Sequence, residues 1–311
     1  LRTGSMQDHQ VSVRGGTDKT KILLSADYFN NVGVIRDQDY TRYSVRVNVD
    51  HNITRAIKVG TQSVFSNSLQ DAGWSDVFDG YGLKSFNPLA SPYEEDGVTL
   101  ALFPTNNTRT PNPVTNFGNT KRVVKQTRYL GNYYADVSFL HGFNFRSNLG
   151  IDYRAGQNLN FSKENTAAAG GEAPSSTSNG GNKRFMYTWE NILSYHKSIH
   201  DTHNFYATLV QSIQSETEET YGISVKDLPY DQQLYYNVGS ALTINGISSN
   251  YSQWNLASFM GRLNYSYKDK YLATVSARYD GSSVLADGHK WVVFPSVALA
   301  WRLKSEPFLE D

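Results

Sequence analysis

The sequence predicts an all-β protein: an antiparallel transmembrane β-barrel with long outer loops, to which this chain contributes about eleven strands. Three observations support this fold class. Apolar and polar residues alternate with a period of two from one end of the chain to the other. The alternating segments are long, and the connections between them are alternately short and long. Together these features are typical of a membrane-spanning barrel rather than of a soluble sheet.

The alternation is clearest in four segments. In residues 42–50, valines and a tyrosine at the odd positions share one face, and arginine, serine, asparagine and aspartate share the other. The same division recurs in residues 143–154, 259–267 and 271–280. Because successive side chains of a strand point to opposite sides of the sheet, each segment has one apolar and one polar face.

The length of these segments indicates a membrane protein. They run for about 10 to 16 residues, against about 5 to 6 for a strand of a globular sheet. About 9 to 11 tilted residues cross a bilayer, and aromatic residues favour its two interfaces. The chain has 21 Tyr, 15 Phe and 5 Trp, and aromatics often begin or end the apolar faces. A soluble β-sandwich would instead have short strands with turns every 8–12 residues or so.

The connections give the order of the strands. Short turns are expected near residues 17–19, 54–56, 141–142, 199–202 and 269–270. Longer links are expected near residues 30–38, 69–121, 162–182, 216–252 and 281–290. Tight turns on one side and long loops on the other are typical of an outer-membrane barrel. The segment 167–181 is rich in Gly, Ala and Ser, so we expect a low-complexity loop there.

A stripe of arginines lies on the polar faces. It comprises Arg42, Arg46, Arg128, Arg146, Arg154, Arg262 and Arg278. An Arg facing lipid at the centre of a bilayer costs about 2–4 kcal/mol, so these side chains should face the barrel lumen. We expect most of them to pair with acids on the same face and so to hold the wall together, while a few contact a passing substrate. The expected acids are Asp27, Asp50, Asp136, Asp152 and Asp280.

Composition excludes several classes of function. The formal net charge is zero, which argues against a general nucleic-acid binder, and the absence of Cys removes disulfides and thiolate sites. No G-x-S-x-G, P-loop or G-x-G-x-x-G motif occurs. His196, His200 and His203 are expected to surround a polar turn, and Glu216, Glu218 and Glu219 to lie on a loop. The sequence therefore predicts no enzyme and names no catalytic, cofactor-binding or metal-binding residue.

The link 69–121 is too long for a plain connection and is expected to have a function. Its aromatic residues stand among Asp, Asn, Gly and Pro. Exposed aromatic rings can stack on sugar rings or pack against a partner protein. Trp74, Tyr81 and Tyr93 are therefore the candidate substrate-binding residues. The alternative is that these rings form a small core of the loop itself.

Several short motifs resemble those of SusC/RagA-type, TonB-linked outer-membrane proteins of Bacteroidetes. They are 262–272 (RLNYSYKDKYL), 278–283 (RYDGSS), 294–296 (FPS) and 300–302 (AWR), with 13–20 (VRGGTDKT) and 43–50 (YSVRVNVD) nearer the N-terminus. Each motif is loose, but their order and spacing together are specific. The resemblance spans essentially the whole chain.

The resemblance implies a nutrient transporter, a TonB-dependent receptor of the outer membrane. Its barrel would have 22 strands or so, of which this chain would be about half. Residues 1–311 would all belong to the barrel domain. An N-terminal plug domain would lie outside the chain, since Leu1 is neither a Met nor part of a leader, and so would the C-terminal strands, since about eleven strands are too few for such a barrel. The implied cargo is an oligosaccharide or other glycan, with a peptide as the alternative. The implied partners are a SusD-like surface lipoprotein and the TonB complex, and pairs of the two outer-membrane proteins could dimerise.

Two other readings of the residues stay open. One is a passive porin or adhesin barrel without energy coupling, which would have the same alternating strands. The other is a soluble β-rich carbohydrate-binding module, which would use the loop aromatics in the same way.

Overall fold

The chain forms one sheet of eleven strands in the computed structural model, which describes residues 2–73, 87–105, 110–306 and 308. The strands are β1 (Ser5–Gly16), β2 (Thr20–Val32), β3 (Gln38–Asn52), β4 (Ile57–Ala72), β5 (Thr120–Phe139), β6 (Phe143–Ser162), β7 (Ser176–Ile199), β8 (His203–Lys226), β9 (Thr243–Tyr267), β10 (Tyr271–Ser282) and β11 (Trp291–Trp301). Four short 3-10 helices lie in the connections: η1 (Pro113–Asn116), η2 (Asp231–Gln233), η3 (Val238–Ser240) and η4 (Leu303–Ser305).

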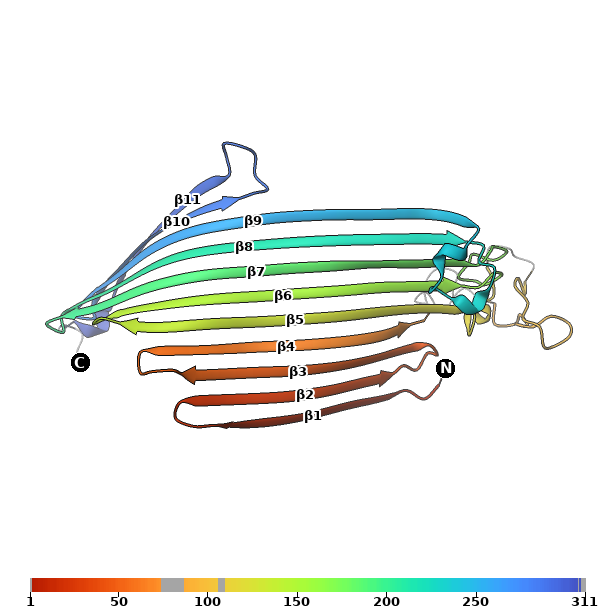
Figure 1. Ribbon diagram of the computed structural model, residues 1–311, viewed down its shortest axis with the longest axis horizontal. Coiled ribbons are helices and arrows are strands. Elements are labelled where there is room, and N and C mark those ends of the chain that lie inside the picture. The colour runs from red at the N-terminus through yellow and green to blue at the C-terminus, as the bar shows by residue number, and fades with distance from the viewer. Residues whose placement is uncertain (1, 74–86, 106–109, 307, 309–311) are drawn as a thin grey trace.

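Every strand pairs antiparallel with the next strand in the chain, so the sheet is a simple meander. Figure 1 shows the strands side by side in a broad, curved wall that does not close on itself. We call the side of the tight turns the turn end and the opposite side the loop end. The all-β antiparallel barrel-type fold predicted from the sequence is confirmed. No helix in the described part of the chain is long and apolar enough to cross a membrane.

The tight turns lie where the sequence predicted them. Lys268 and Asp269 between β9 and β10 both have positive φ, and so do His200 and Asp201 between β7 and β8. This backbone twist matches that of the flanking strands, as in type I′ hairpins. At Gly142, φ is 91° and the backbone carbonyl of His196 lies where a side chain would begin, so only glycine fits without strain.

The loop end differs from the prediction. Strands β7, β8 and β9 have 24, 24 and 25 residues, well beyond the expected length. The predicted link 162–182 is therefore wrong from Ser176 onward, and the link 216–252 is wrong except between β8 and β9. The physical reason is that these extensions lie beyond the apolar band, so neither of their faces contacts lipid. They need no apolar alternation, and ladder hydrogen bonds to the neighbouring strands hold them extended.

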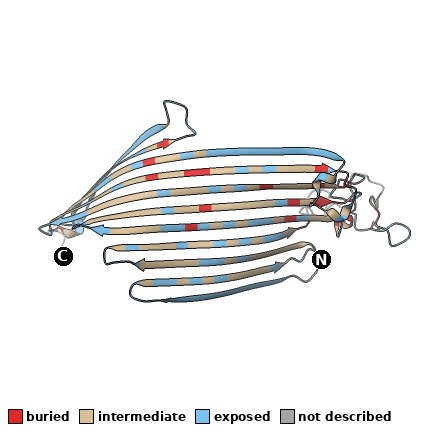
Figure 2. Ribbon diagram, in the orientation of Figure 1, coloured by how far each residue is buried: buried red, intermediate tan, exposed pale blue. Residues whose placement is uncertain are grey.

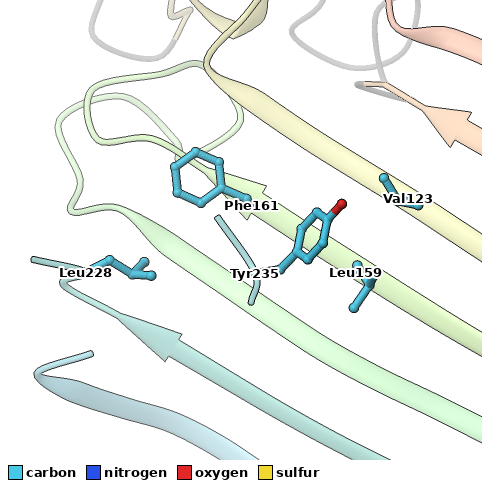
Figure 3. Packing of buried hydrophobic residues seen from close by; sticks show 5 residues of the cluster. All are labelled: Val123, Leu159, Phe161, Leu228 and Tyr235. Atoms are coloured by element: carbon cyan, nitrogen blue, oxygen red, sulfur yellow. The ribbon is translucent and has the colours of Figure 1, made fainter. Parts of the chain in front are cut away.

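Little of the wall is buried in a core. Figure 2 shows mostly exposed and intermediate residues along the strands. The apolar core cluster lies at the loop end and comprises Val123, Leu159, Phe161, Leu228 and Tyr235. Figure 3 shows the rings of Phe161 and Tyr235 close together over the ends of the strands. The connection between β8 and β9 thus folds back and covers part of the sheet.

Candidate functional site

The pairing register divides the sheet into two chemically different faces. Residues directly opposite each other on neighbouring strands share a face, so each face can be followed from β1 to β11. Every arginine within the strands lies on the same side, which we call the polar face. These residues are Arg14, Arg42, Arg46, Arg122, Arg128, Arg146, Arg154, Arg184, Arg262 and Arg278.

The opposite side, the aromatic face, has the pattern of a lipid-facing surface. Near the loop end, Phe65, Tyr129, Tyr153 and Phe185 lie directly opposite one another across β4 to β7. A second belt lies near the turn end and includes Phe143, Tyr195, Tyr267, Tyr271 and Trp301. Between the belts, the described residues of this face include no Asp, Glu, Lys or Arg.

The spacing of the two belts fits a bilayer. From Phe185 to Tyr195, strand β7 runs for about 33 Å at ~3.3 Å per residue. A strand tilt of ~40° reduces this to about 25 Å along the barrel axis, which is the height of the apolar band of outer-membrane barrels. Exposed side chains such as Trp189, Leu209 and Val275 fill the band. The polar face is therefore the lumen side of the wall.

Three arginines form a row across the polar face. Arg128 of β5 lies directly opposite Arg154 of β6, which lies directly opposite Arg184 of β7. Like charges in this position repel each other and destabilise a sheet unless acids are close. The row lies at the same height as the aromatic belt but on the other side of the sheet, because the three arginines are sequence neighbours of Tyr129, Tyr153 and Phe185.

Two buried carboxylates neutralise most of this charge. Asp152 is 8% exposed and accepts two hydrogen bonds from Arg128, at 3.2 and 3.0 Å, and two from Arg154, at 3.2 and 2.7 Å. Glu216 is 9% exposed and accepts a hydrogen bond of 2.6 Å from Arg184. Such charge-assisted bonds tie β5 to β6 and β7 to β8.

A second charged cluster lies nearer the turn end and is centred on Tyr134. Its phenol donates a hydrogen bond to Asp50, which also pairs with Lys58 at 3.5 Å. The guanidinium carbon of Arg146 lies 4.4 Å from the centroid of the Tyr134 ring, a cation–π contact, and Arg146 pairs with Asp136 at 3.6 Å. The cluster joins β3, β4, β5 and β6 into one unit.

Most of the expected pairs are confirmed. Arg42 pairs with Asp27, Arg128 and Arg154 with Asp152, Arg146 with Asp136, and Arg278 with Asp280. Asp50 differs, since its partners are Lys58 and Tyr134 rather than an arginine. The expectation that Glu216 lies on a loop is wrong, because it is a buried residue of β8 paired with Arg184.

Arg46 and Arg262 are the exceptions among the expected arginines. Both are exposed, and neither has an ion pair within the described part of the chain. Arg46 stands at the rim of a hollow of about 380 Å³ on the polar face, lined also by Asn48, Gln62, Asn132 and Asp152. Gly150, which lies opposite Asn132 on the polar face, also lines the hollow and has no side chain to fill it. These side chains can offer hydrogen bonds to a body inside the lumen.

Of the candidate loop residues, only Tyr93 can be placed. Trp74 and Tyr81 lie outside the described residues. Tyr93 is 43% exposed and forms an isolated bridge with Leu100. Between them Asp96 closes a turn by accepting hydrogen bonds from the Val98 and Thr99 backbone and the Thr99 hydroxyl. These bonds hold the pKa of Asp96 below its usual value, and the bond from the Thr99 hydroxyl has the largest effect. The structure does not bring Tyr93 to any of the polar-face clusters.

The sequence reasoning missed the residue that organises this loop. Asn112 is fully buried, donates hydrogen bonds to the carbonyls of Pro92 and Ala101, and accepts one from the Val114 backbone. One asparagine thus ties three parts of the link together. The only sequence signal is Pro113 directly after it, which is typical of a capping residue.

Tyr235 in the β8–β9 connection was also missed. It belongs to the core cluster and is 5% exposed. Burial, and to a smaller extent a hydrogen bond with Tyr236, raises its pKa to about 12. Its apolar neighbours Val123, Leu159 and Phe161 were visible in the sequence. Their contact with a residue more than seventy positions away was not.

Three of the histidines surround a turn, as the sequence predicted. His196 lies near the end of β7, His203 begins β8, and His200 is at the tip of the hairpin. Within the described ranges, no group of three or more His, Asp or Glu side chains could hold a metal ion.

Comparison with curated proteins gives relatives that share nearly the whole chain. It is 29% identical to the TonB-dependent receptor P26 of Formosa agariphila over 310 residues, 97% of this chain and 30% of the relative. It is 30% identical to receptor P3 of the same organism, over 99% of this chain and 31% of the relative. It is 24% identical to the TonB-dependent receptor SusC of Bacteroides thetaiotaomicron, over 100% of this chain and 32% of the relative. The chain thus spans about a third of the length of these relatives. No protein-family model matches it.

Solved structures share the fold. A chain of the RagAB peptide transporter superposes with a TM-score of 0.81 and 19% identity, over 100% of this chain and 35% of that one. The unliganded ferric citrate transporter FecA superposes with a TM-score of 0.56 and 8% identity, over 98% of this chain and 40% of that one. The likeness to RagAB in particular extends to the long strands of the loop end, because the whole chain is covered.

Proposed function

Because this chain is a SusC-like segment of the barrel wall of a TonB-dependent receptor, we propose that the protein takes part in the TonB-dependent import of a nutrient across the outer membrane. The observation that carries the proposal is the division of the sheet. A face free of charge between two aromatic belts suits lipid, and the opposite face carries all the strand arginines. The sequence similarity to the receptors covers 97% and 99% of the chain.

In this proposal the polar face has two tasks. The paired arginines hold neighbouring strands of a wide barrel together, because each carboxylate bridges residues of different strands. The unpaired Arg46 and Arg262 stay available to a plug domain inside the lumen. A barrel of about 22 strands is wide enough to contain such a plug.

The proposed cargo is an oligosaccharide, with a peptide as the alternative. Tyr93 would stack on it at the loop end, together with Trp74 and Tyr81. Aromatic rings on a polar loop suit the apolar face of a sugar ring. The neighbouring RagAB structure is that of a peptide transporter, so a peptide stays the second option for this chain.

The proposed partners act at opposite ends of the wall. A SusD-like surface lipoprotein would cover the loop end and enclose the cargo, and the TonB complex would pull on the plug from the turn end. Two such pairs would form a dimer. The support is the similarity to SusC and to a chain of the RagAB peptide transporter.

Uptake by the full-length protein in its native outer membrane tests the proposal. Labelled oligosaccharides and peptides of defined length are supplied to cells with and without an uncoupler of the proton gradient. We expect one cargo class to enter only in energised cells that have TonB. Uptake that continues without TonB would instead identify a passive porin.

The role of Tyr93 needs a separate measurement. Tyr93→Ala should weaken cargo binding at equilibrium by about tenfold or less, since one stacked ring contributes ~0.5–1.5 kcal/mol. Tyr230→Ala is the matched control, because Tyr230 is also exposed, at 64%, but lies on the β8–β9 connection. Equal binding by the Tyr93 variant and the wild-type protein would remove Tyr93 from the site while leaving the transport proposal intact.

A further inference from the structure

The wall has a step at strand β9. Strand β10 pairs with β9 only up to the Ser282–Leu256 pair, and the last contact is a hydrogen bond of 2.9 Å from the Ser283 backbone to the Asn255 carbonyl. From there β9 continues to Thr243, paired on one side only, with β8. Figure 1 shows the β10–β11 hairpin ending far short of the loop end of β9. No described residue pairs with the other edge of β9 between Thr243 and Gln253.

This open edge is regular and accessible. Residues 243–253 are all exposed. In an antiparallel ladder, the backbone N–H and C=O of one residue point to the same neighbouring strand and alternate along the chain. Because Asn255 points toward β10, the residues Ile247, Ser249, Tyr251 and Gln253 point toward the open side. They offer about 20 Å of unpaired strand edge.

Among the described residues, the edge between Ile247 and Gln253 has none of the devices that normally prevent pairing. Free edges of soluble sheets are protected by Lys, Glu, Pro, bulges or covering loops. Residues 243–255 read TINGISSNYSQWN, with no charged residue and no proline, and the one bulge lies at its far end, near Val225. An uncharged strand edge of this length is a template for another strand.

The side chains specify what kind of strand would fit. Ile247 and Tyr251 are 71% and 59% exposed on the aromatic face, whereas Ser248, Asn250 and Ser252 lie on the polar face. A complementary strand would have apolar residues at alternate positions on the outer side and small polar residues on the inner side. It would be uncharged, because the edge has no charge with which to pair.

We propose that an extended, uncharged segment of the surface lipoprotein adds a strand to the open edge of β9. The inference rests on the proposed function, which supplies that partner at the loop end. The position of the edge favours this occupant. It lies beyond the membrane band, and it is open from the side because the β10–β11 hairpin ends below it. A further strand of the wall beside β11 would be three strand spacings from β9, about 14 Å.

Photocrosslinking in the full-length complex tests the contact directly. The crosslinking residue p-benzoylphenylalanine is placed at Tyr251 or at Phe259, in cells that contain the lipoprotein. Phe259 is the matched control, because it lies on the same face of β9 but its edge is covered by Tyr279 of β10. We expect the probe at position 251, and not that at 259, to crosslink to one extended peptide of the lipoprotein.

A backbone variant tests the hydrogen bonding. Ser249→Pro removes an edge N–H but no bond to β8, since that N–H points to the open side. It should weaken the complex with the lipoprotein by about tenfold, while Ser249→Ala should not. Equal amounts of both variants in the outer membrane show that they fold.

The outcomes separate the two proposals. If the lipoprotein does not copurify with the wild-type protein, the proposed partnership fails. If it copurifies but the probe at 251 crosslinks only within its own chain, or Ser249→Pro binds like wild type, the partnership stands and the β9 edge inference is overturned.

Discussion

Arg154 and Arg184 face each other directly across β6 and β7, and each is held by a carboxylate from another residue. Asp152 lies two residues from Arg154 in the same strand and also binds Arg128, whereas Glu216 reaches Arg184 from β8. Like charges at directly opposite positions destabilise a sheet, so the row depends on these two acids. The charges on the lumen side are therefore coupled to the stability of the wall.

Removing Arg184 should destabilise the barrel more than removing a more exposed arginine. Arg184→Ala leaves Glu216, with an 11% exposed side chain, without its partner, and we expect a loss of about 1–3 kcal/mol. Arg278→Ala is the control, because the Arg278 and Asp280 side chains are 44% and 25% exposed, and it should cost less than about 1 kcal/mol. Urea unfolding of the full-length protein in lipid vesicles measures both. Equal losses would contradict the proposed role of burial.

Reversing the chemistry of the aromatic face should destabilise the membrane-inserted barrel. Leu149→Arg places a charge in the middle of the apolar band, and we expect a cost of about 2–4 kcal/mol. Asn132→Arg is the matched control, because Asn132 lies at nearly the same height but lines the hollow of the polar face. The same unfolding measurement applies. Equal stability of the two variants would contradict the assignment of the faces, and a larger loss for Asn132→Arg would mean that they had been assigned the wrong way round.

The membrane-spanning part of the fold was predictable because lipid and water select different residues on the two faces of each strand. Lipid on one side and water on the other force the alternation seen from Tyr43 to Val49, and the arginines show which side is wet. The turns at His200 and Lys268 were predictable from polar residues between alternating segments.

The strands of the loop end were not predictable, because the contrast between lipid and water is missing there. Where β7 runs from Ser176 to Lys183 it lies beyond the apolar band, so neither face contacts lipid and no apolar periodicity distinguishes strand from loop. Only pairing with β6 and β8 makes this Gly- and Ser-rich segment a strand. The contacts of Asn112 and Tyr235 join residues far apart in the sequence, and no local pattern predicts them.

Raising the pH should release the β8–β9 connection from the wall. The neutral phenol of Tyr235 is favoured in the folded state, where its pKa is raised to about 12 from 10.0. The stabilisation is complete below the unfolded value and is lost as the pH rises through the folded value. Limited proteolysis of residues 227–242 should therefore accelerate between about pH 10 and pH 12. Absorbance titration should show a late-titrating phenol component that Tyr235→Phe reduces by one phenol. Cleavage independent of pH over this range would argue against the buried phenol as the anchor.

Asn112→Ala should loosen the loop without weakening the barrel. The substitution leaves the buried carbonyl of Ala101 and the Val114 N–H without their partner, and a group left unpaired in this way costs about 1–3 kcal/mol. It also removes one of the two hydrogen bonds to the Pro92 carbonyl, which keeps the one from the Ala101 backbone. The loss is local, because these bonds lie within the link between β4 and β5 and not in the strand ladders. Hydrogen exchange should become faster in residues 87–119 and stay unchanged in β5 and β6. Asn87→Ala is the control, since the Asn87 side chain accepts one exposed hydrogen bond, from the Leu89 backbone, and its loss should leave the loop protected. If exchange in β5 rose as well, the loop and the wall would unfold as one unit, and Asn112 would be part of the stability of the barrel itself.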